Sequence, residues 1–307
     1  MNSSPLSSSF ARALQAAQDA AGGQQHPIGT LYVVATPIGN LADISLRALH
    51  VLGLVDAIAC EDTRHTQQLL RAYGLDRPGS QLLAVHQHNE AEAAQGVLDK
   101  LAQGQRVAYV SDAGTPAISD PGARLVAAVR AAGYRVLPLP GASSVVTVLS
   151  AAGMTGDNGF VFAGFLPSKA AERQQAVQAL AAEPRAVVLL EAPHRIEALA
   201  QALAVLGERR VTLGRELTKQ FEQIETLKVQ DLSAWLAEKP ERQRGEFALV
   251  LHDAPVAASS GEGERVLRLL LAELPLKTAV KLAAEITGES KNALYERALQ
   301  IKQSDAA

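Results

Sequence analysis

The sequence predicts an α/β protein with two domains and a small C-terminal helical module. With 307 residues the chain is longer than one typical domain. Its first half alternates short apolar runs with segments of helical periodicity, which is typical of β-α units around a mainly parallel sheet. Aromatic residues make up only 4% of the chain. This low share favours Val- and Leu-rich parallel strands over an aromatic-rich sandwich.

The N-terminal domain is expected over residues 28–155 and its sheet should be parallel. Before it, residues 1–27 are rich in Ser, Ala and Gln, and we expect a flexible tail with at most a weak helix over 10–20. The expected strands are, in order, LYVVAT, VDAIAC, residues 82–85, RVAYVSD and YRVLPLPG. Helical segments separate them, and the last one, over 143–152, leads to a Gly- and Asn-containing boundary near residue 155.

The second α/β domain is expected over residues 156–255 with a mixed sheet. Its strand candidates are FVFAGFL, AVVLLEA, RRVTLGREL, FEQIETLKV and EFALVLHD, and its helices are expected over 169–182, 194–205 and 231–238. After Arg209, successive strand candidates follow without a crossover helix. Such strands pair antiparallel, so the sheet cannot be purely parallel.

A helix-turn-helix-like module is expected over residues 264–303, after a Gly/Ser/Ala-rich linker at 256–263. Two amphipathic helices, over 276–286 and 292–301, flank a short turn in which Gly288 suits a left-handed helix stop. Lys277, Lys281 and Lys291 lie near this turn. The module could therefore contact RNA phosphates, and the alternative is a dimer contact or a lid.

Composition and missing motifs narrow the function. A net charge of −3 argues against strong attraction of the whole protein to nucleic acid, so such a partner would need local basic patches. The single cysteine, Cys60, allows no intramolecular disulfide, and the N-terminus has no secretory pattern, so a cytoplasmic location is expected. No G-x-G-x-x-G or Walker A loop occurs. HQHN at residues 86–89 has no third ligand in view, so no metal is expected.

Polar, Gly- and Pro-rich loops follow four of the expected strands in the first domain. They are TPIGN (36–40), EDTRH (61–65), SDAGTP continuing to ISDPG (111–122), and PLPGASS (138–144). In open α/β sheets ligands bind at the carboxyl ends of the strands. Any one loop could be a simple turn, but four at one edge predict a ligand site. The helix N-terminus at Ser143 adds free N–H groups for an anion.

The motifs TPIGNLADIS, CEDTRHT, SDAGTPAISDPG, PLPGASS, EAPHRI and GRELTK resemble the 16S rRNA (cytidine-2′-O)-methyltransferase family of the tetrapyrrole-methylase superfamily. The resemblance extends over roughly residues 29–303. It implies two α/β domains with S-adenosylmethionine in the cleft between them, and a homodimer. It also implies methylation of the ribose of a decoding-site cytidine.

The resemblance assigns a cofactor pocket by position. It would be lined by Pro37, Asp112, Ala113, Gly114, Ile118, Ser143 and Ser144 from the first domain, and by Leu190, Glu191, Ala192, Phe247 and Ala248 from the second. A carboxylate suits the sulfonium and amino groups of the cofactor, and Ile118, Leu190 and Phe247 suit its adenine. Plain sheet core is the alternative for Leu190 and Phe247.

On the substrate side, a general base must come within about 3 Å of the hydroxyl oxygen. The catalytic candidates are Glu61, Glu191 and Lys219, although Lys219 could simply form an ion pair with Glu216. The residues expected to hold RNA phosphates are Arg64, Arg195, Arg215, Lys219, Lys277, Lys281 and Lys291. Solvated surface charge is the alternative for each of them.

Two other functions remain open. One is a small-molecule methylase of the same fold that acts on a corrinoid precursor, which would need neither the helical module nor the arginines of CEDTR and EAPHRI. The other is a non-enzymatic RNA-binding protein. The complete set of loops at the cofactor edge disfavours this second alternative.

Overall fold

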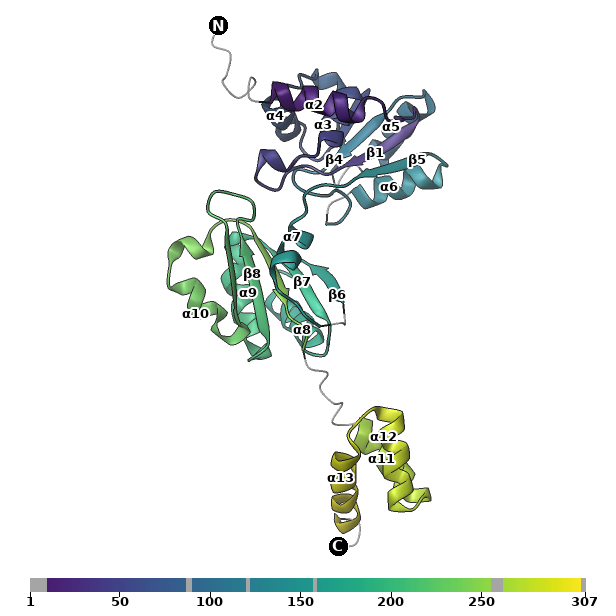
Figure 1. Ribbon diagram of the computed structural model, residues 1–307, viewed down its shortest axis with the longest axis vertical. Coiled ribbons are helices and arrows are strands. Elements are labelled where there is room, and N and C mark those ends of the chain that lie inside the picture. Colours follow the sequence, from purple (N-terminus) through teal and green to yellow (C-terminus); the bar gives the residue numbers. More distant parts are fainter. Residues whose placement is uncertain (1–9, 87–89, 120–121, 157–158, 255–261, 305–307) are drawn as a thin grey trace.

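The computed structural model describes residues 10–86, 90–119, 122–156, 159–254 and 262–304. Figure 1 shows two α/β domains that follow one another along the long axis, and three helices at the C-terminal end. The expected fold class, a parallel-sheet domain, a mixed-sheet domain and a helical module, is confirmed.

The first sheet is parallel throughout, with the order β3-β2-β4-β1-β5. Its strands are β1 (Thr30–Val34), β2 (Ala57–Cys60), β3 (Leu82–Ala84), β4 (Val107–Val110) and β5 (Arg135–Leu139). The helices are α3 (Leu46–Leu54), α4 (Thr63–Ala72), α5 (Glu90–Ala102) and α6 (Gly122–Ala131), with short 3-10 turns at Leu41–Asp43 and Gly79–Gln81. Leu31 and Val33 pack against α5 and α6, whereas Tyr32 and Val34 face α3 and α4. Alternate strand residues thus bury both faces of the sheet.

An additional helix, α2 (Ala11–Ala21), packs on the outside of α3. The weak helix that the sequence allowed over 10–20 is present as α2, and because it is packed, a flexible tail does not describe residues 10–21. Ala17 and Ala21 are buried, and the ring of Phe10 meets Tyr73 edge-on with 5.0 Å between the ring centroids. Tyr73 is itself fixed, because its hydroxyl donates to the Leu41 carbonyl at 2.7 Å. The apolar face of α2, which consists largely of small residues, thus packs against Leu49 and Tyr73, which are distant in the sequence.

The second sheet is mixed, with the order β6-β7-β10-β8-β9. Its strands are β6 (Phe160–Gly164), β7 (Ala186–Glu191), β8 (Arg210–Arg215), β9 (Gln223–Lys228) and β10 (Phe247–Leu251). Only β6 and β7 pair in parallel; the other neighbours are antiparallel. Phe247 is paired with Glu191 on one side and Arg215 on the other. The carboxyl ends of β7 and β8 and the start of β10 therefore lie at the same end of the sheet.

Helices cover both faces of this second sheet. One face carries α8 (Ala170–Ala181), α9 (Ile196–Leu203) and α10 (Leu232–Ala237), with 3-10 turns at Pro193–Arg195, Ala204–Leu206, Val229–Asp231 and Pro240–Gln243. The other face carries α7 (Ser144–Ala151), whose Val145 and Val148 pack on Val188 and Val250. Although α7 follows β5 of the first sheet, its core contacts lie in the second domain. The helix thus connects the two sheets (Figure 1).

The C-terminal module has a hydrophobic core of its own. It consists of α11 (Glu262–Glu273), α12 (Leu276–Thr287) and α13 (Lys291–Ser304), which bury Leu267, Ala283 and Leu294 against one another. Gly288 ends α12 with φ of +72°, as expected for a left-handed stop. Residues 255–261, most of the expected linker, lie outside the described residues. Within the described chain, no helix combines the length and apolar character needed to span a bilayer.

Cys60 at the end of β2 should be chemically inert in the folded protein. Its side chain is fully buried, and this burial raises the pKa of the thiol to about 11. At pH 8 only about 0.1% would be thiolate, the reactive form. We expect a water-soluble disulfide reagent to leave the native protein unlabelled and to label one thiol per chain in guanidinium. Rapid labelling of the native protein, followed by absorbance, would contradict this burial.

Candidate active site

The loops after β1, β4 and β5 are joined into one surface by hydrogen bonds. Thr36 and Gly114 form an isolated antiparallel bridge, with N–O distances of 3.0 and 3.1 Å in its two directions. The Thr36 hydroxyl also donates to the Ser111 carbonyl at 3.2 Å, and that of Thr115 donates to the Ala142 carbonyl at 3.0 Å. Gly114 has φ of +82°, which favours glycine. These loops therefore form a single fixed floor.

A cavity of about 430 Å³ lies between this floor and the near edge of the second sheet. We call it the interdomain cavity. It brings together most residues that the sequence assigned to the cofactor, namely Asp112, Ala113, Gly114, Ile118, Ser143, Ser144, Leu190, Glu191, Ala192, Phe247 and Ala248. Glu61, a catalytic candidate, also lines it. Pro37 does not line it, because the residue is buried in the loop and Ile38 faces the cavity in its place.

The cavity is also lined by residues that were not assigned to the cofactor individually. Ile38, Ser111, Thr115 and Ser119 lie in the loops that the sequence placed at the ligand site. The sequence analysis missed Val145, Phe165, Pro193, Leu217 and Glu246. Phe165 follows β6 directly and Glu246 directly precedes β10, so both lie at the same edge as Glu191. The ends of the expected strands in the second domain could therefore have indicated these two residues. Residues 120–121 of the third loop lie outside the described residues.

Asp62 shapes the second loop. Its carboxylate Oδ1 accepts the N–H groups of Arg64 at 2.8 Å and His65 at 3.3 Å, which caps α4. These hydrogen bonds to the carboxylate lower the pKa of Asp62. The N–H of Asp62 in turn donates to Asp112 Oδ1 at 3.3 Å. Asp62 therefore fixes Asp112, and the side chain of Arg64, whose Nε lies 3.8 Å from Asp62 Oδ1, is 89% exposed.

Glu191 presents a buried oxygen that no described residue bonds. The residue is 2% exposed, and its Oε1 accepts the N–H of Ala192 at 2.9 Å and lies 3.0 Å from Arg195 Nε. Its Oε2 is buried without a hydrogen bond to any residue that the structure describes. A buried acceptor of this kind needs a donor, and a ligand in the cavity could supply it.

Arg195, expected to hold a phosphate, is largely engaged within the protein. Besides the contact with Glu191, its Nη2 donates to the Leu166 carbonyl, and only 22% of its side chain is exposed. Arg215 is similarly occupied, since its Nη1 donates to the Arg244 carbonyl at 3.1 Å. The structure places both arginines as supports of the cavity edge.

Lys219 forms an ion-paired cluster at the cavity entrance. Its Nζ lies 2.9 Å from Glu216 Oε1 and 3.0 Å from Glu246 Oε2. Partial burial lowers the pKa of Lys219, but the hydrogen bonds to the two carboxylates outweigh it and the pKa is raised overall. Lys219 is therefore protonated at neutral pH. A protonated amine can hold an anion but cannot act as a general base.

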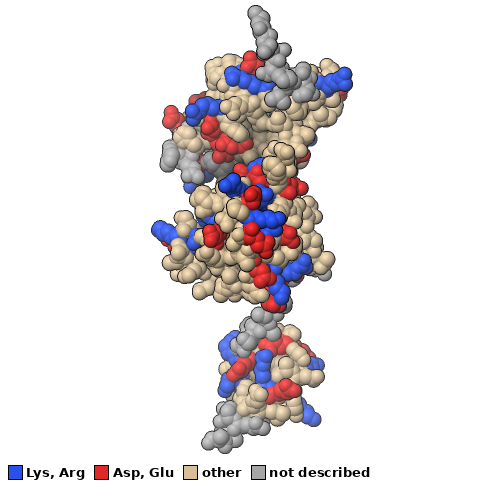
Figure 2. Space-filling model, turned by 90° about the vertical axis from the view of Figure 1, so that its left-hand side faces the viewer, with Lys and Arg blue, Asp and Glu red and all other residues tan. Residues whose placement is uncertain are grey.

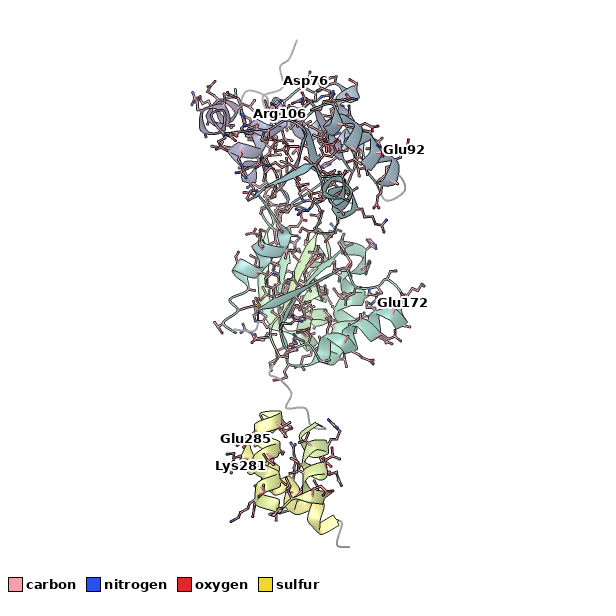
Figure 3. All side chains as sticks on the ribbon, turned by 90° about the vertical axis from the view of Figure 1, so that its right-hand side faces the viewer. Asp76, Glu92, Arg106, Glu172, Lys281 and Glu285 are labelled. Carbon is pink, nitrogen blue, oxygen red and sulfur yellow. The ribbon has the colours of Figure 1, made fainter. Side chains whose placement is uncertain are left out.

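The three lysines of the module lie apart from this cavity. Lys277, Lys281 and Lys291 are all exposed. Lys281 and Glu285 lie one turn apart on α12, with 4.0 Å between Nζ and Oε1 (Figure 3). Figure 2 shows another gathering of acidic and basic side chains where the two α/β domains meet. Among the described residues no cluster of His, Cys, Asp and Glu could hold a metal, and residues 87–89 of HQHN are outside them.

This fold and the position of its cavity define the class of the tetrapyrrole methylases. The family described as Tetrapyrrole (Corrin/Porphyrin) Methylases matches residues 30–233, and the RsmI C-terminal HTH domain matches residues 257–302. Among solved structures, diphthine synthase superposes with a TM-score of 0.55 at 13% identity, covering 73% of this chain and 90% of its own. The methyltransferase CobJ gives 0.54 at 18% identity, covering 74% and 95%. These two show the fold.

Curated relatives of higher identity narrow the family. The Ribosomal RNA small subunit methyltransferase I of Escherichia coli O157:H7 is 51% identical over 276 residues, which covers 89% of this chain and 95% of that protein. The protein of the same name from Neisseria meningitidis serogroup A is 47% identical over 297 residues, covering 95% and 99%. The chain therefore belongs to the ribosomal RNA small subunit methyltransferase I family.

Substitution of Glu191 by Gln tests the buried acceptor. The change keeps the shape of the side chain but removes the charge that faces the cavity. Loss of a charged hydrogen bond is worth about 1.5–3 kcal/mol, so the dissociation constant of S-adenosylmethionine should rise about 10- to 100-fold in a calorimetric titration. Glu197→Gln, the same change on the exposed side of α9, is the matched control and should leave it unchanged. An unchanged constant with impaired turnover would instead assign Glu191 to proton transfer.

Proposed function

We propose that this chain transfers the methyl group of S-adenosylmethionine to the ribose 2′-hydroxyl of a decoding-site cytidine in 16S rRNA. The observation that carries this proposal is the interdomain cavity, which joins the loop edge of a parallel sheet to the Glu191 edge of a mixed sheet. In the reaction the hydroxyl oxygen bonds to the methyl carbon as the sulfonium C–S bond breaks. The hydroxyl proton passes to a base, and S-adenosylhomocysteine leaves.

The chemistry of the cavity suits this cofactor. Its volume lies in the range of small-molecule sites, and two of its lining residues, Ile118 and Phe165, are about half exposed. Ser143 begins α7 without a side-chain cap, so the first N–H groups of this helix remain available for a carboxylate. Asp112 and Glu191 add the negative charge that an amino group and a sulfonium favour. These groups would hold the two polar ends of the cofactor and leave its adenine to the apolar wall.

We assign the proton of the ribose hydroxyl to Glu61. It lines the cavity on the loop after β2, where the cap formed by Asp62 fixes the backbone. Glu191 Oε1 is already engaged by the Ala192 N–H and by Arg195, so we assign Glu191 to the cofactor rather than to the proton. Lys219, which is protonated and paired with Glu216 and Glu246, positions the loop at the edge of the cavity. Holding the two reactants in line accounts for much of the rate.

An RNA substrate is favoured over a corrinoid. The solved cobalt precorrin-4 methyltransferase, a cobalamin biosynthetic enzyme, shares the fold at only 18% identity, whereas the relatives of about 50% identity carry a ribosomal RNA name. The module that follows the second domain exposes three lysines, and Arg64, three residues after the cavity-lining Glu61, is exposed. We also propose a homodimer, as the resemblance implies, and a location in the cytoplasm, where bacterial ribosomal subunits are found.

Mapping of ribose methylation in a strain without this protein tests the function. One decoding-site cytidine of 16S rRNA should lose its 2′-O-methyl group and regain it when the gene is restored. The purified protein with labelled S-adenosylmethionine should transfer label to RNA from that strain and not to RNA from the parent. Unchanged 16S rRNA in the mutant, together with labelling of a tetrapyrrole precursor, would support the corrinoid alternative.

The lysines of the module should contribute to RNA affinity through phosphate contacts. Replacing Lys277, Lys281 and Lys291 by Ala should flatten the log–log dependence of RNA affinity on salt by about 2–3 units, because three phosphates lose their cations. Affinity for S-adenosylmethionine should not change. A triple variant at Lys100, Lys228 and Lys239, in the two α/β domains, is matched in charge and should keep the original slope. Equal slopes in both triple variants would assign the module to packing.

A further inference from the structure

The loop of residues 216–222, between β8 and β9, lies at the edge of the interdomain cavity. Arg215 at the end of β8 is paired with both Phe247 and Gln223, so the loop leaves the sheet beside the start of β10. Leu217 within the loop lines the cavity. Figure 1 shows this loop at the end of β8 that faces the first domain. The loop therefore borders the space that the target nucleotide must enter.

This loop is held in a specific backbone conformation. Glu216 and Thr218 have φ of +51° and +68°, and among the described non-glycine residues only Ala117 also has a positive φ. The Thr218 N–H donates to Glu222 Oε2 at 2.6 Å, and Glu216 Oε1 accepts the N–H of Glu246 at 2.9 Å. Such conformations persist only where their surroundings enforce them, and they concentrate at functional sites.

Lys219 braces the loop against the first domain. Its side chain crosses Gly39 so closely that a Cβ atom there would lie 2.4 Å from Lys219 Cγ. Gly39 adjoins Ile38, which lines the cavity. The same lysine is paired with Glu216 and Glu246 of the second domain. Both domains thus fix the position of the loop.

Phe221 is 69% exposed on this braced loop. An exposed aromatic ring on a rigid loop at the edge of the cavity is suited to stacking against a flat group of a partner molecule. Unpaired RNA bases are such partners, because they stack on aromatic side chains irrespective of their sequence. Single-stranded loops and bulges of a folded RNA offer splayed-out bases for such a contact.

We propose that Phe221 is a stacking platform for an unpaired base of the RNA, at the methylated nucleotide or its neighbour. Lys219, Glu216 and Glu246 are positioning residues that hold this platform at the cavity entrance. The inference rests on the proposed function, since it needs an RNA substrate. It adds a substrate contact that acts through an aromatic face and requires no charge.

Replacing the ring while keeping its apolar character isolates the stacking. In the full-length protein, Phe221→Leu and Phe221→Ala should each weaken equilibrium binding of unmethylated 16S rRNA about 10- to 100-fold, and KM should rise in parallel. Phe221→Trp should bind as well as the unmodified protein. Phe160→Ala is the matched control: Phe160 is 48% exposed at the start of β6, the end away from the cavity, and its loss should have no effect. The dissociation constant of S-adenosylmethionine should stay the same in all four variants.

Two outcomes would overturn the inference. If Phe221→Leu bound RNA as tightly as the unmodified protein, stacking would be excluded. If Phe221→Ala changed the mass in light scattering, the ring would belong to a contact with a second copy of the chain. Failure of the proposed function is recognised separately, because the unmodified protein would then leave 16S rRNA unmethylated. Equilibrium binding would still test Phe221 in that case, since stacking does not require turnover.

Discussion

The backbone bridge between Thr36 and Gly114 joins the loops after β1 and β4, and the cavity is built on this connection. Neighbouring parallel strands bring their carboxyl ends to one edge, but loops at such an edge are free to diverge. Here the bridge, the Thr36 hydroxyl and the Thr115 hydroxyl hold three loops together. Asp112, Ser143 and Ile118 consequently face one space.

The second half of the cavity depends on α7. The helix starts at the loop edge of the first sheet, and its apolar side chains are buried in the second domain. Its first turn therefore meets the end of β7, where Glu191 is located. The helix thus links the two sheets. It follows the last strand of the first domain in sequence, but it packs against the sheet of the second domain. A cavity formed in this way needs no insertion in either domain.

The sequence could predict those features that follow from local pattern. Strand-helix alternation predicted the parallel sheet, and strand-end loops placed Asp112, Gly114 and Ser143 at one site. Tertiary pairing decided the rest. The stripe of α2 is mostly Ala and gains its burial from distant residues, among them Leu49 of α3 and Tyr73. Arg195 is occupied by Glu191 and the Leu166 carbonyl. Pro37 is buried and does not line the cavity. Phe165 and Glu246 reach the cavity through the pairing of β6 and β10 with β7, which local pattern does not predict.

The separate core of the C-terminal helices has a consequence for the way a large substrate is engaged. Leu267, Ala283 and Leu294 pack within the module, so it can keep its shape without the α/β domains. Two folded units on one chain bind a common target with avidity: once the first is attached, the second searches at a local concentration in the millimolar range. If the cavity and the module both contact the RNA, as proposed, two individually weak contacts suffice for firm attachment. A short RNA fragment that fills only the cavity gains none of this advantage.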